Sequence, residues 1–279
     1  MQIGIGLPSN IPGVRRTQLL EWARRAEARG FSTLAANDRL VYDNLEPLIA
    51  LSAAAAVTTR IRLATTILIA PLRANPVLLA KQAASLNRLA DGRLTLGLAP
   101  GGRQDDFTTS DLDFHTRGHT LDHHLTRLHD TWNNPDIGPH HTTPRLLIGG
   151  FTPTSFTRAA THADGWIAGG GDPDFFRHCA QQAHTAWHTA HRTDTPHLTA
   201  TSHFVIGAEA EARARRFLLD YFAFAGPHAR EIVDSSLKVD EADIKATVDA
   251  CANAGADELI LFSVDPDPDQ VDRLADIVL

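Results

Sequence analysis

Cysteine, long apolar runs and basic clusters are all scarce in this chain. Its 279 residues include only Cys179 and Cys251, which lie far apart and form no C-x-x-C pair. This excludes a disulfide framework and a thiolate zinc site. No apolar run reaches the ~20 residues of a membrane-spanning helix, and the first residues lack a basic segment followed by an apolar one. We therefore expect a cytoplasmic protein with no membrane partner.

Positive charge is also in deficit. The formal net charge is -7 and the pI is near 6.1, and the basic residues are scattered, which excludes nucleic acid as a partner. No G-x-G-x-x-G stretch is present, so direct NAD(P)H binding has no local support. The hydrophobic content of 43% is ordinary for a globular protein, and the length suits either two average domains or one α/β barrel.

Short apolar segments alternate with amphipathic ones along the whole chain. Strands are expected at 2–7, 33–36, 61–69, 94–98, 145–149, 165–168, 198–206 and 258–263. Helices are expected at 17–29, 46–57, 75–89, 115–132, 152–161, 172–190, 209–225, 241–254 and 269–278. Eight strands that alternate with helices favour a single (β/α)8 TIM barrel over residues 1–279, rather than two domains.

One stretch, 92–107, indicates a binding site. An apolar strand runs into a Pro/Gly-rich loop and a long polar loop, and Gly97, Gly101 and Gly102 allow a ligand to approach the backbone closely. The preceding segment, 61–76, repeats the design of a strand followed by a polar loop and a helix. Two such units in succession place the chemistry at the carboxyl ends of parallel strands.

Five segments carry a family resemblance. They are AEARGFSTLAANDR, TTRIRLATTILIAPLRANPVLLAKQAASLNRLADGRLTLGLAPGGRQDDF, PRLLIGGFTPTS, HADGWIAGG and AGADELILF. In this order they make the chain resemble the bacterial luciferase-like family of flavin- or F420-dependent oxidoreductases, especially its short members with GGR-x-DDF, IGGF and GWIAGG.

The resemblance implies a monooxygenase and its partners. Reduced FMN, supplied by a separate flavin reductase, would use O2 to oxygenate a small organic substrate, and the protein would be a homodimer. F420-dependent hydride transfer is the first alternative, and a flavin-binding protein without catalysis is the second.

Two glycine clusters are candidates for the cofactor phosphate. In LIGGFTPTS, Thr152 is expected to be the N-cap of a helix and Pro153 its first residue. Free N–H groups at such a helix N-terminus bind anions, although a purely structural turn is the alternative. With the resemblance, the groups assigned to the cofactor are Gly149, Gly150, Phe151, Thr152, Gly169 and Gly170.

The resemblance also assigns the flavin ring. Thr66 and Ile67 match the place where the family often has a cis non-proline peptide and a bulge under the ring. Asn37, Asp38 and Arg39 end the second strand, where the family usually has an acidic residue followed by a histidine.

The arginine at this position changes the expected chemistry. A guanidinium cannot act as a base near neutral pH, so we expect Arg39, with Asp38 beside it, to stabilise negative charge on the reduced flavin. An ion pair of Arg39 with Asp38 or Asp43 is the alternative.

Charged and aromatic residues complete the expected site. Asp106 matches the family's acidic position and is expected to contact the cofactor, whereas a solvated loop is the alternative. The candidates for the substrate pocket are Asn37, Tyr42, Arg103 and Tyr221. Phe222 and Phe224, which follow Tyr221, are most simply interpreted as packing residues.

Histidine is abundant, with 15 residues. His115, His119 and His123 have the i, i+4 spacing of a helical metal site, but no H-E-x-x-H is present. We interpret the histidines between residues 113 and 203, including His140 and His141, as solvated surface, and we expect no metal.

Overall fold

Eight parallel strands close into a barrel. The computed structural model describes residues 1–140, 143–170, 172–207 and 210–279. The barrel strands are β1 (Gln2–Gly6), β2 (Thr33–Ala36), β3 (Arg62–Ile69), β4 (Leu94–Ala99), β5 (Arg145–Gly149), β6 (Gly165–Ile167), β7 (His197–Phe204) and β9 (Glu258–Ser263). Each pairs with its neighbour in this order, and β9 pairs with β1 to close the ring. A short strand, β8 (Leu237–Lys238), pairs with the end of β7.

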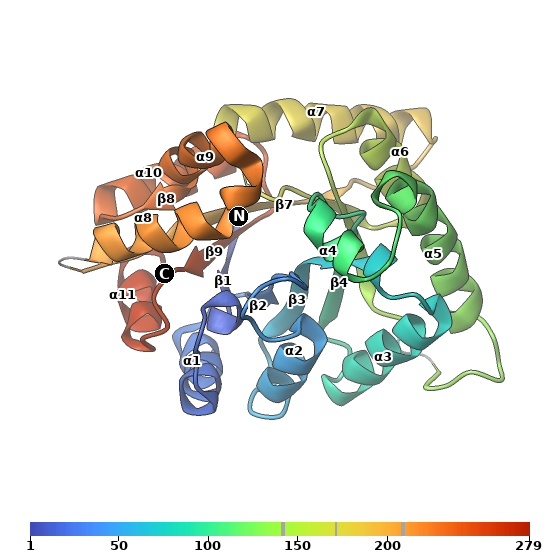
Figure 1. Ribbon diagram of the computed structural model, residues 1–279, viewed down its shortest axis with the longest axis horizontal. Coiled ribbons are helices and arrows are strands. Elements are labelled where there is room, and N and C mark those ends of the chain that lie inside the picture. The colour runs from blue at the N-terminus through green and yellow to red at the C-terminus, as the bar shows by residue number, and fades with distance from the viewer. Residues whose placement is uncertain (141–142, 171, 208–209) are drawn as a thin grey trace.

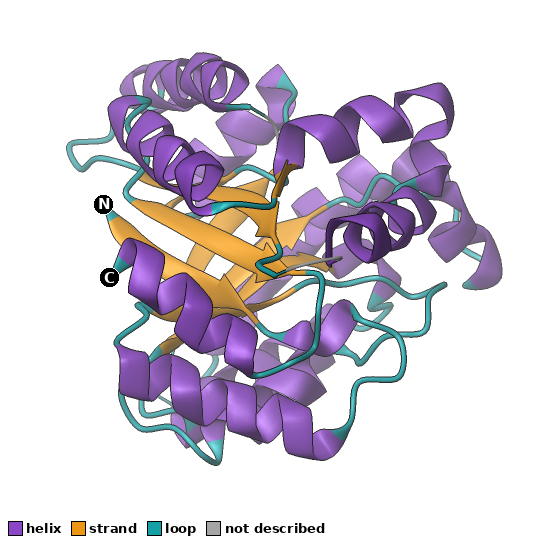
Figure 2. Cartoon of the chain, turned by 90° about the vertical axis from the view of Figure 1, so that its left-hand side faces the viewer, coloured by secondary structure: helices purple, strands orange, loops and turns teal. Residues whose placement is uncertain are grey.

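The helices cover the outside of the barrel (Figure 1; Figure 2). They are α1 (Arg16–Arg29), α2 (Pro47–Ala55), α3 (Pro76–Leu89), α4 (Gln104–Thr109), α5 (Arg117–Trp132), α6 (Pro153–His162), α7 (Pro173–Thr189), α8 (Ala210–Tyr221), α9 (Ala229–Ser236), α10 (Glu241–Asn253) and α11 (Asp269–Val278). Short 3-10 turns η1 (Pro8–Asn10), η2 (Ala70–Leu72), η3 (Phe114–Thr116) and η4 (Ala223–His228) lie between them. No helix in the described ranges is both long and apolar enough to cross a membrane.

The predicted TIM barrel is confirmed, and each strand boundary lies within two residues of its expected place. The long polar loop predicted after the fourth strand is wrong, because it contains α4, whose first turn carries Asp105 and Asp106 where a helix dipole favours negative charge. The helix expected at 209–225 ends early, at Tyr221, and Glu209 lies outside the described residues. The helix α9 and the strand β8 were not predicted.

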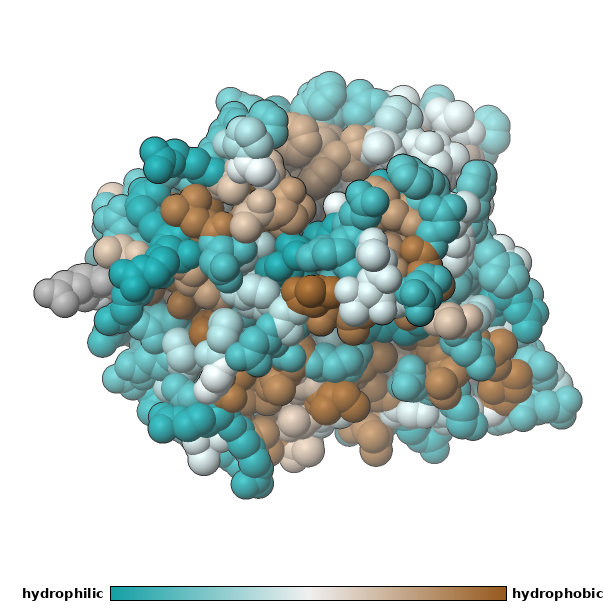
Figure 3. All heavy atoms as spheres, in the orientation of Figure 1, coloured by the Kyte–Doolittle hydropathy of each residue, from teal (hydrophilic) through white to brown (hydrophobic). Residues whose placement is uncertain are grey.

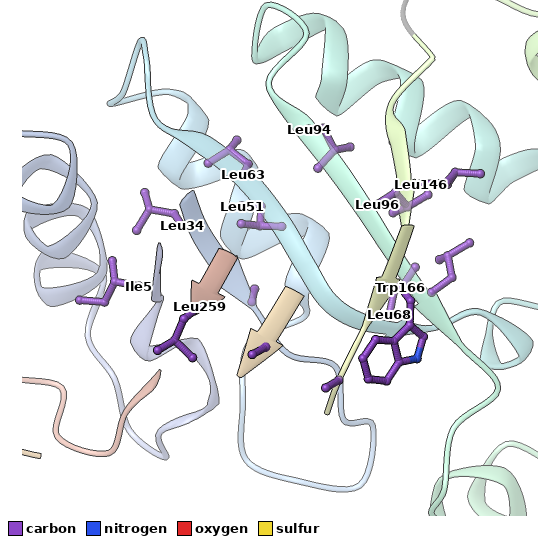
Figure 4. Packing of buried hydrophobic residues seen from close by; sticks show 14 of the residues in the cluster. Ile5, Leu34, Leu51, Leu63, Leu68, Leu94, Leu96, Leu146, Trp166 and Leu259 are labelled. Atoms are coloured by element: carbon purple, nitrogen blue, oxygen red, sulfur yellow. The ribbon is translucent and has the colours of Figure 1, made fainter. Parts of the chain in front are cut away.

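Apolar strand residues pack against the inner faces of the helices. Leu34, Leu63 and Leu259 project from three strands into the core between the strands and the helices, and Leu51 of α2 packs in the same core (Figure 4). Burying one such leucine contributes about 1.5–3 kcal/mol to the stability of the wall that carries the strand ends. The two cysteines are buried free thiols.

Candidate active site

A cavity opens at the carboxyl ends of the strands, where a barrel of this kind places its chemistry. Its lining comes from the ends of β2, β3, β4, β6, β7 and β9 and from the segment after α8: Asn37, Asp38, Arg39, Thr66, Ile67, Ile69, Gly101, Gly102, Arg103, Gly169, Thr201, His203, Tyr221, Phe222, Phe224 and Phe262. Residues predicted from five separate parts of the sequence therefore meet in one place. Phe222 and Phe224, interpreted as packing residues, line this cavity as well.

The floor of the cavity is a bulge in β3. The Thr66–Ile67 peptide is cis, as the family resemblance implies, and the pairing of β3 with β4 shifts between Thr65 and Leu68. Gly97 of β4 makes room for this bulge, because a Cβ there would lie 2.2 Å from the carbonyl oxygen of Thr65. Ile67 also lies against Gly149, where an added Cβ would be 3.1 Å from the Ile67 side chain.

Hydrogen bonds attach the end of β2 to this bulge. The hydroxyl of Thr66 donates to Asn37 Oδ1 over 2.8 Å. The Asp38 carboxylate accepts from the backbone N–H of Ile69 at 2.8 Å and pairs with Arg73. Asp38 is thus occupied by Ile69, at the end of β3, and by Arg73, and it does not pair with Arg39.

Arg39 is a buried cation, with 8% of its surface exposed. Its Nη1 donates to the backbone oxygen of Tyr221 at 2.8 Å. Its guanidinium carbon lies 4.0 Å from the centre of the Tyr42 ring and 4.7 Å from that of Tyr221. Nε has no hydrogen-bond partner among the described residues. Neither alternative ion pair, with Asp38 or Asp43, is formed.

The surroundings of Arg39 lower its pKa, but the guanidinium remains protonated. Burial, followed by the charge of Arg103, lowers the pKa of Arg39 below its ordinary value. A guanidinium stays charged at neutral pH. The cavity therefore contains a buried positive charge with a donor still available, which suits an anionic or electron-rich group.

Asp106 holds the two loops of the site together. It is fully buried, and its Oδ1 accepts from the backbone N–H groups of Leu40 at 3.2 Å and Val41 at 2.8 Å. Its Oδ2 lies 3.7 Å from Nε of Arg103, which also pairs with the half-exposed Asp105. The alternative of a solvated loop is therefore wrong for Asp106, whose carboxylate ties α4 to the loop that carries Arg39.

The N-terminus of α6 forms a second cleft. Thr152 is the N-cap, as predicted, and accepts from Ser155 N at 3.3 Å, with Pro153 as the first helical residue. Gly150 has φ +127°, and a Cβ there would lie 2.4 Å from Ser155 Oγ, so the turn requires glycine. The cleft is lined by Pro100, His115, Arg117, Gly118, His119, Asp122, Gly150, Phe151, Thr152, Thr154, Ser155 and Arg158.

This cleft borders the main cavity across the loop after β4, because Pro100 lines one and Gly101 the other. Gly169 lies in the main cavity, whereas Gly170 lines a separate small cleft at the N-terminus of α7. The two predicted glycine clusters therefore do not share one opening. Arg117, which donates to the carbonyl of Gly101 at 3.0 Å, adds a cation to the α6 cleft that the sequence did not single out.

The solvated-surface interpretation is wrong for two histidines. His124 is buried, and its ring nitrogens lie 2.7 Å from the carbonyl oxygens of Thr120 and Arg73. His203 is buried at the cavity wall. The available signal was the i, i+2 spacing of Thr201 and His203 on one face of β7. His141 lies outside the described residues.

A closed parallel barrel with a bulge in β3 beneath a cavity at its carboxyl end is the architecture of luciferase-like (β/α)8 barrels. The model of the family described as luciferase-like monooxygenase matches residues 1–271, and the chain belongs to this family.

Relatives of known sequence match over part of the chain. An uncharacterised protein of Mycobacterium tuberculosis is 30% identical over 189 residues, which cover 54% of this chain and 65% of that protein. 2,5-Diketocamphane 1,2-monooxygenase 1 of Pseudomonas putida is 33% identical over 106 residues, or 36% of this chain and 29% of that enzyme. The match thus spans under two thirds of each relative.

Solved structures share the fold over the full length. An F420-dependent secondary alcohol dehydrogenase in complex with an F420–acetone adduct has a TM-score of 0.82 at 16% identity and covers 99% of this chain and 98% of its own. The monooxygenase RslO1 from Streptomyces bottropensis has a TM-score of 0.77 at 18% identity, with 99% and 97% covered. At these identities the likeness concerns the fold.

Proposed function

We propose that this protein is an FMN-dependent monooxygenase that oxygenates a small organic substrate. The observation that carries the proposal is the buried Arg39, whose Nε has no partner among the described residues and which lines the same cavity as the bulge at Thr66 and Ile67. A flat ring above the bulge would lie beside this cation. The membership of the luciferase-like monooxygenase family supports the same function.

The residues present fit the FMN group. The bulge at Thr66 and Ile67 offers a support for the ring. Gly102 and Gly169 line the cavity, and a Cβ at either would meet no atom within 4 Å, so the space beside them is open to a ligand. The phosphate is assigned to the α6 cleft, where the N–H groups around Phe151 and Thr152 meet the dipole of the helix N-terminus. Arg117 would add charge there.

When bound and reduced by a separate reductase, FMN supplies the electrons with which O2 is activated. Arg39 stabilises negative charge on the ring by preorganised electrostatics. Tyr42 and Tyr221 cover the guanidinium and exclude water from it. Asp38 acts as a positioning residue, because its carboxylate fixes the end of β3 through Ile69.

The deciding experiment measures binding of FMN and of F420, each oxidised and anaerobically reduced, by fluorescence and calorimetry. We expect selective binding of reduced FMN, followed by consumption of O2. Selective binding of F420 would instead establish hydride transfer, and binding of FMN without turnover of any substrate would favour the non-catalytic alternative.

A variant tests the role of Arg39. The Arg39→Ala protein should lose affinity for reduced FMN about tenfold more than for oxidised FMN, which lowers the two-electron reduction potential by about 30 mV. Arg39→Lys, which keeps the charge, should recover part of the difference. Equal affinities of the wild type and Arg39→Ala for both forms would refute the electrostatic role.

We further propose that two copies pair through the face formed by α2 and α3. Six apolar side chains there, Leu40, Val41, Leu45, Ile49, Leu78 and Leu89, are 37% to 73% exposed, and four of them line one groove. Figure 3 shows apolar residues gathered over these helices. Apolar patches of this kind on a soluble protein indicate a protein interface, and a homodimer would cover them.

A further inference from the structure

Among the described residues that line the main cavity, His203 is the only histidine. It lies at the carboxyl end of β7, and 7% of its surface is exposed. Its ring meets Phe222 edge-on at 5.7 Å between centroids and Phe262 at 6.2 Å. The imidazole is therefore a polar group set in an aromatic wall.

The ring of His203 lacks the partners that a buried histidine normally has. Its Nδ1 is buried without a hydrogen bond to any described residue, whereas both ring nitrogens of the buried His124 lie 2.7 Å from carbonyl oxygens. Buried polar groups without a partner are rare in native proteins. This histidine is thus placed to bond to something other than the protein.

The imidazole is neutral at physiological pH. Burial lowers the pKa of His203 to about 4. A neutral imidazole presents one N–H donor and one nitrogen acceptor. It therefore suits an uncharged oxygen, such as that of an alcohol or a ketone, better than a carboxylate, for which the cavity already provides Arg39.

The strand order decides which bound molecule His203 faces. In the closed ring of eight strands, β7 lies four positions from β3 in either direction. His203 is therefore across the barrel from the bulge at Thr66 and Ile67, and both ends line one cavity. A ring that rests on the bulge turns its other face toward β7, and the substrate must approach from that side.

We propose that His203 binds the substrate by a hydrogen bond to an uncharged hydroxyl or carbonyl oxygen, while the apolar body of the substrate packs on Phe222 and Phe262. The proposal rests on the proposed function for the position of the cofactor. It deepens that function by naming an oxygen-bearing, otherwise apolar substrate class and the side chain that selects it.

Two isosteric probes test the contact: cyclohexanone, and methylenecyclohexane, in which a carbon replaces the oxygen. Binding is followed by NMR of protein labelled at the histidine ring carbons, without cofactor and with FMN or F420. We expect cyclohexanone to bind about three- to tenfold more tightly, as one hydrogen bond allows, and to shift the His203 signal.

Variants separate this contact from a role in cofactor binding. His203→Phe should abolish the preference for the ketone, His203→Asn should keep part of it, and both should bind the cofactor like the wild type. An unchanged preference in His203→Phe overturns the proposal, as does loss of cofactor affinity in both variants. If His203→Phe does not fold, as judged by circular dichroism, absence of the ketone-induced shift in the wild type overturns it equally well.

The same titrations distinguish failure of the proposed function from failure of the proposal for His203. If the wild type binds neither FMN nor F420, the cofactor assignment is wrong. The comparison of cyclohexanone with methylenecyclohexane in the cofactor-free protein still decides whether His203 contacts an oxygen.

Discussion

Replacing Gly97 by alanine should disturb the bulge under the cavity. The added Cβ would lie 2.2 Å from the carbonyl oxygen of Thr65, well inside van der Waals contact. Because the obstacle is backbone rather than a flexible side chain, β3 or β4 must move. Thr65 Oγ1 also donates to the carbonyl of Gly97 at 2.8 Å, so the same movement strains this hydrogen bond.

The expected cost lies at the upper end of the range for overpacking, about 3 kcal/mol. Gly102→Ala is the matched control, because a Cβ there meets nothing within 4 Å, and it should change the free energy of unfolding by less than ~1 kcal/mol. Urea denaturation followed by circular dichroism measures both. At a slope of about 3 kcal/mol per M, the midpoint of Gly97→Ala should fall by about 1 M.

Cofactor binding provides a second measurement on Gly97→Ala. Because the bulge supports the ring in the proposed function, Gly97→Ala should weaken cofactor binding at least about tenfold, or by about 1.4 kcal/mol. Gly102→Ala is the control for unfolding alone, because Gly102 lines the cavity itself. Equal unfolding free energies for the two variants would refute the steric account of Gly97, whatever their cofactor affinities.

Three further predictions concern other parts of the molecule. As the pH falls from 6.5 to 4, the free energy of unfolding of the wild type should decrease by up to about 3 kcal/mol more than that of His203→Phe, because the histidine is protonated in the unfolded chain but stays neutral when buried. Urea denaturation at several pH values measures this, and an equal pH dependence of the two proteins would contradict it. Asp106→Ala should lower the free energy of unfolding by about 2–4 kcal/mol, because the backbone N–H groups of Leu40 and Val41 lose their acceptor. A free energy of unfolding equal to that of the wild type would show that water replaces the carboxylate as the acceptor. Ile49→Asp, at a side chain 69% exposed, should convert dimers to monomers in sedimentation velocity without changing the fold, and a wild type that is already monomeric would dismiss the pairing.

The barrel was predictable because its signals are local. Each strand is a short apolar run, and a glycine or proline lies near most of its ends, so the alternation with helices could be followed without knowledge of any long-range contact. The helix α4 was missed because five of its six residues are polar and its stability depends on burial of Phe107 and Asp106 in the folded protein. Tertiary contacts override local preference in such short segments.

The site was predictable where the family resemblance reached and less so elsewhere. The cis peptide at Thr66 followed from the resemblance, not from any property of the residues. The alternative that paired Arg39 with Asp38 failed because the partner of Asp38 is Arg73, 35 residues further along the chain. His203 was hidden among many histidines, because its i, i+2 spacing with Thr201 shows that the two share a face of the strand but not that this face lines the cavity.

The position of Arg39 links the electrostatics of the cavity to the packing of one helix. Its guanidinium is held by the backbone and ring of Tyr221, 182 residues away in sequence, at the end of α8. With α8 in place, the charge acts through a medium of low dielectric constant, in which Coulomb interactions are several times stronger than in water. Withdrawal of α8 would admit water around the cation and screen it. Docking of α8 therefore sets the strength of the field in the cavity as well as its shape.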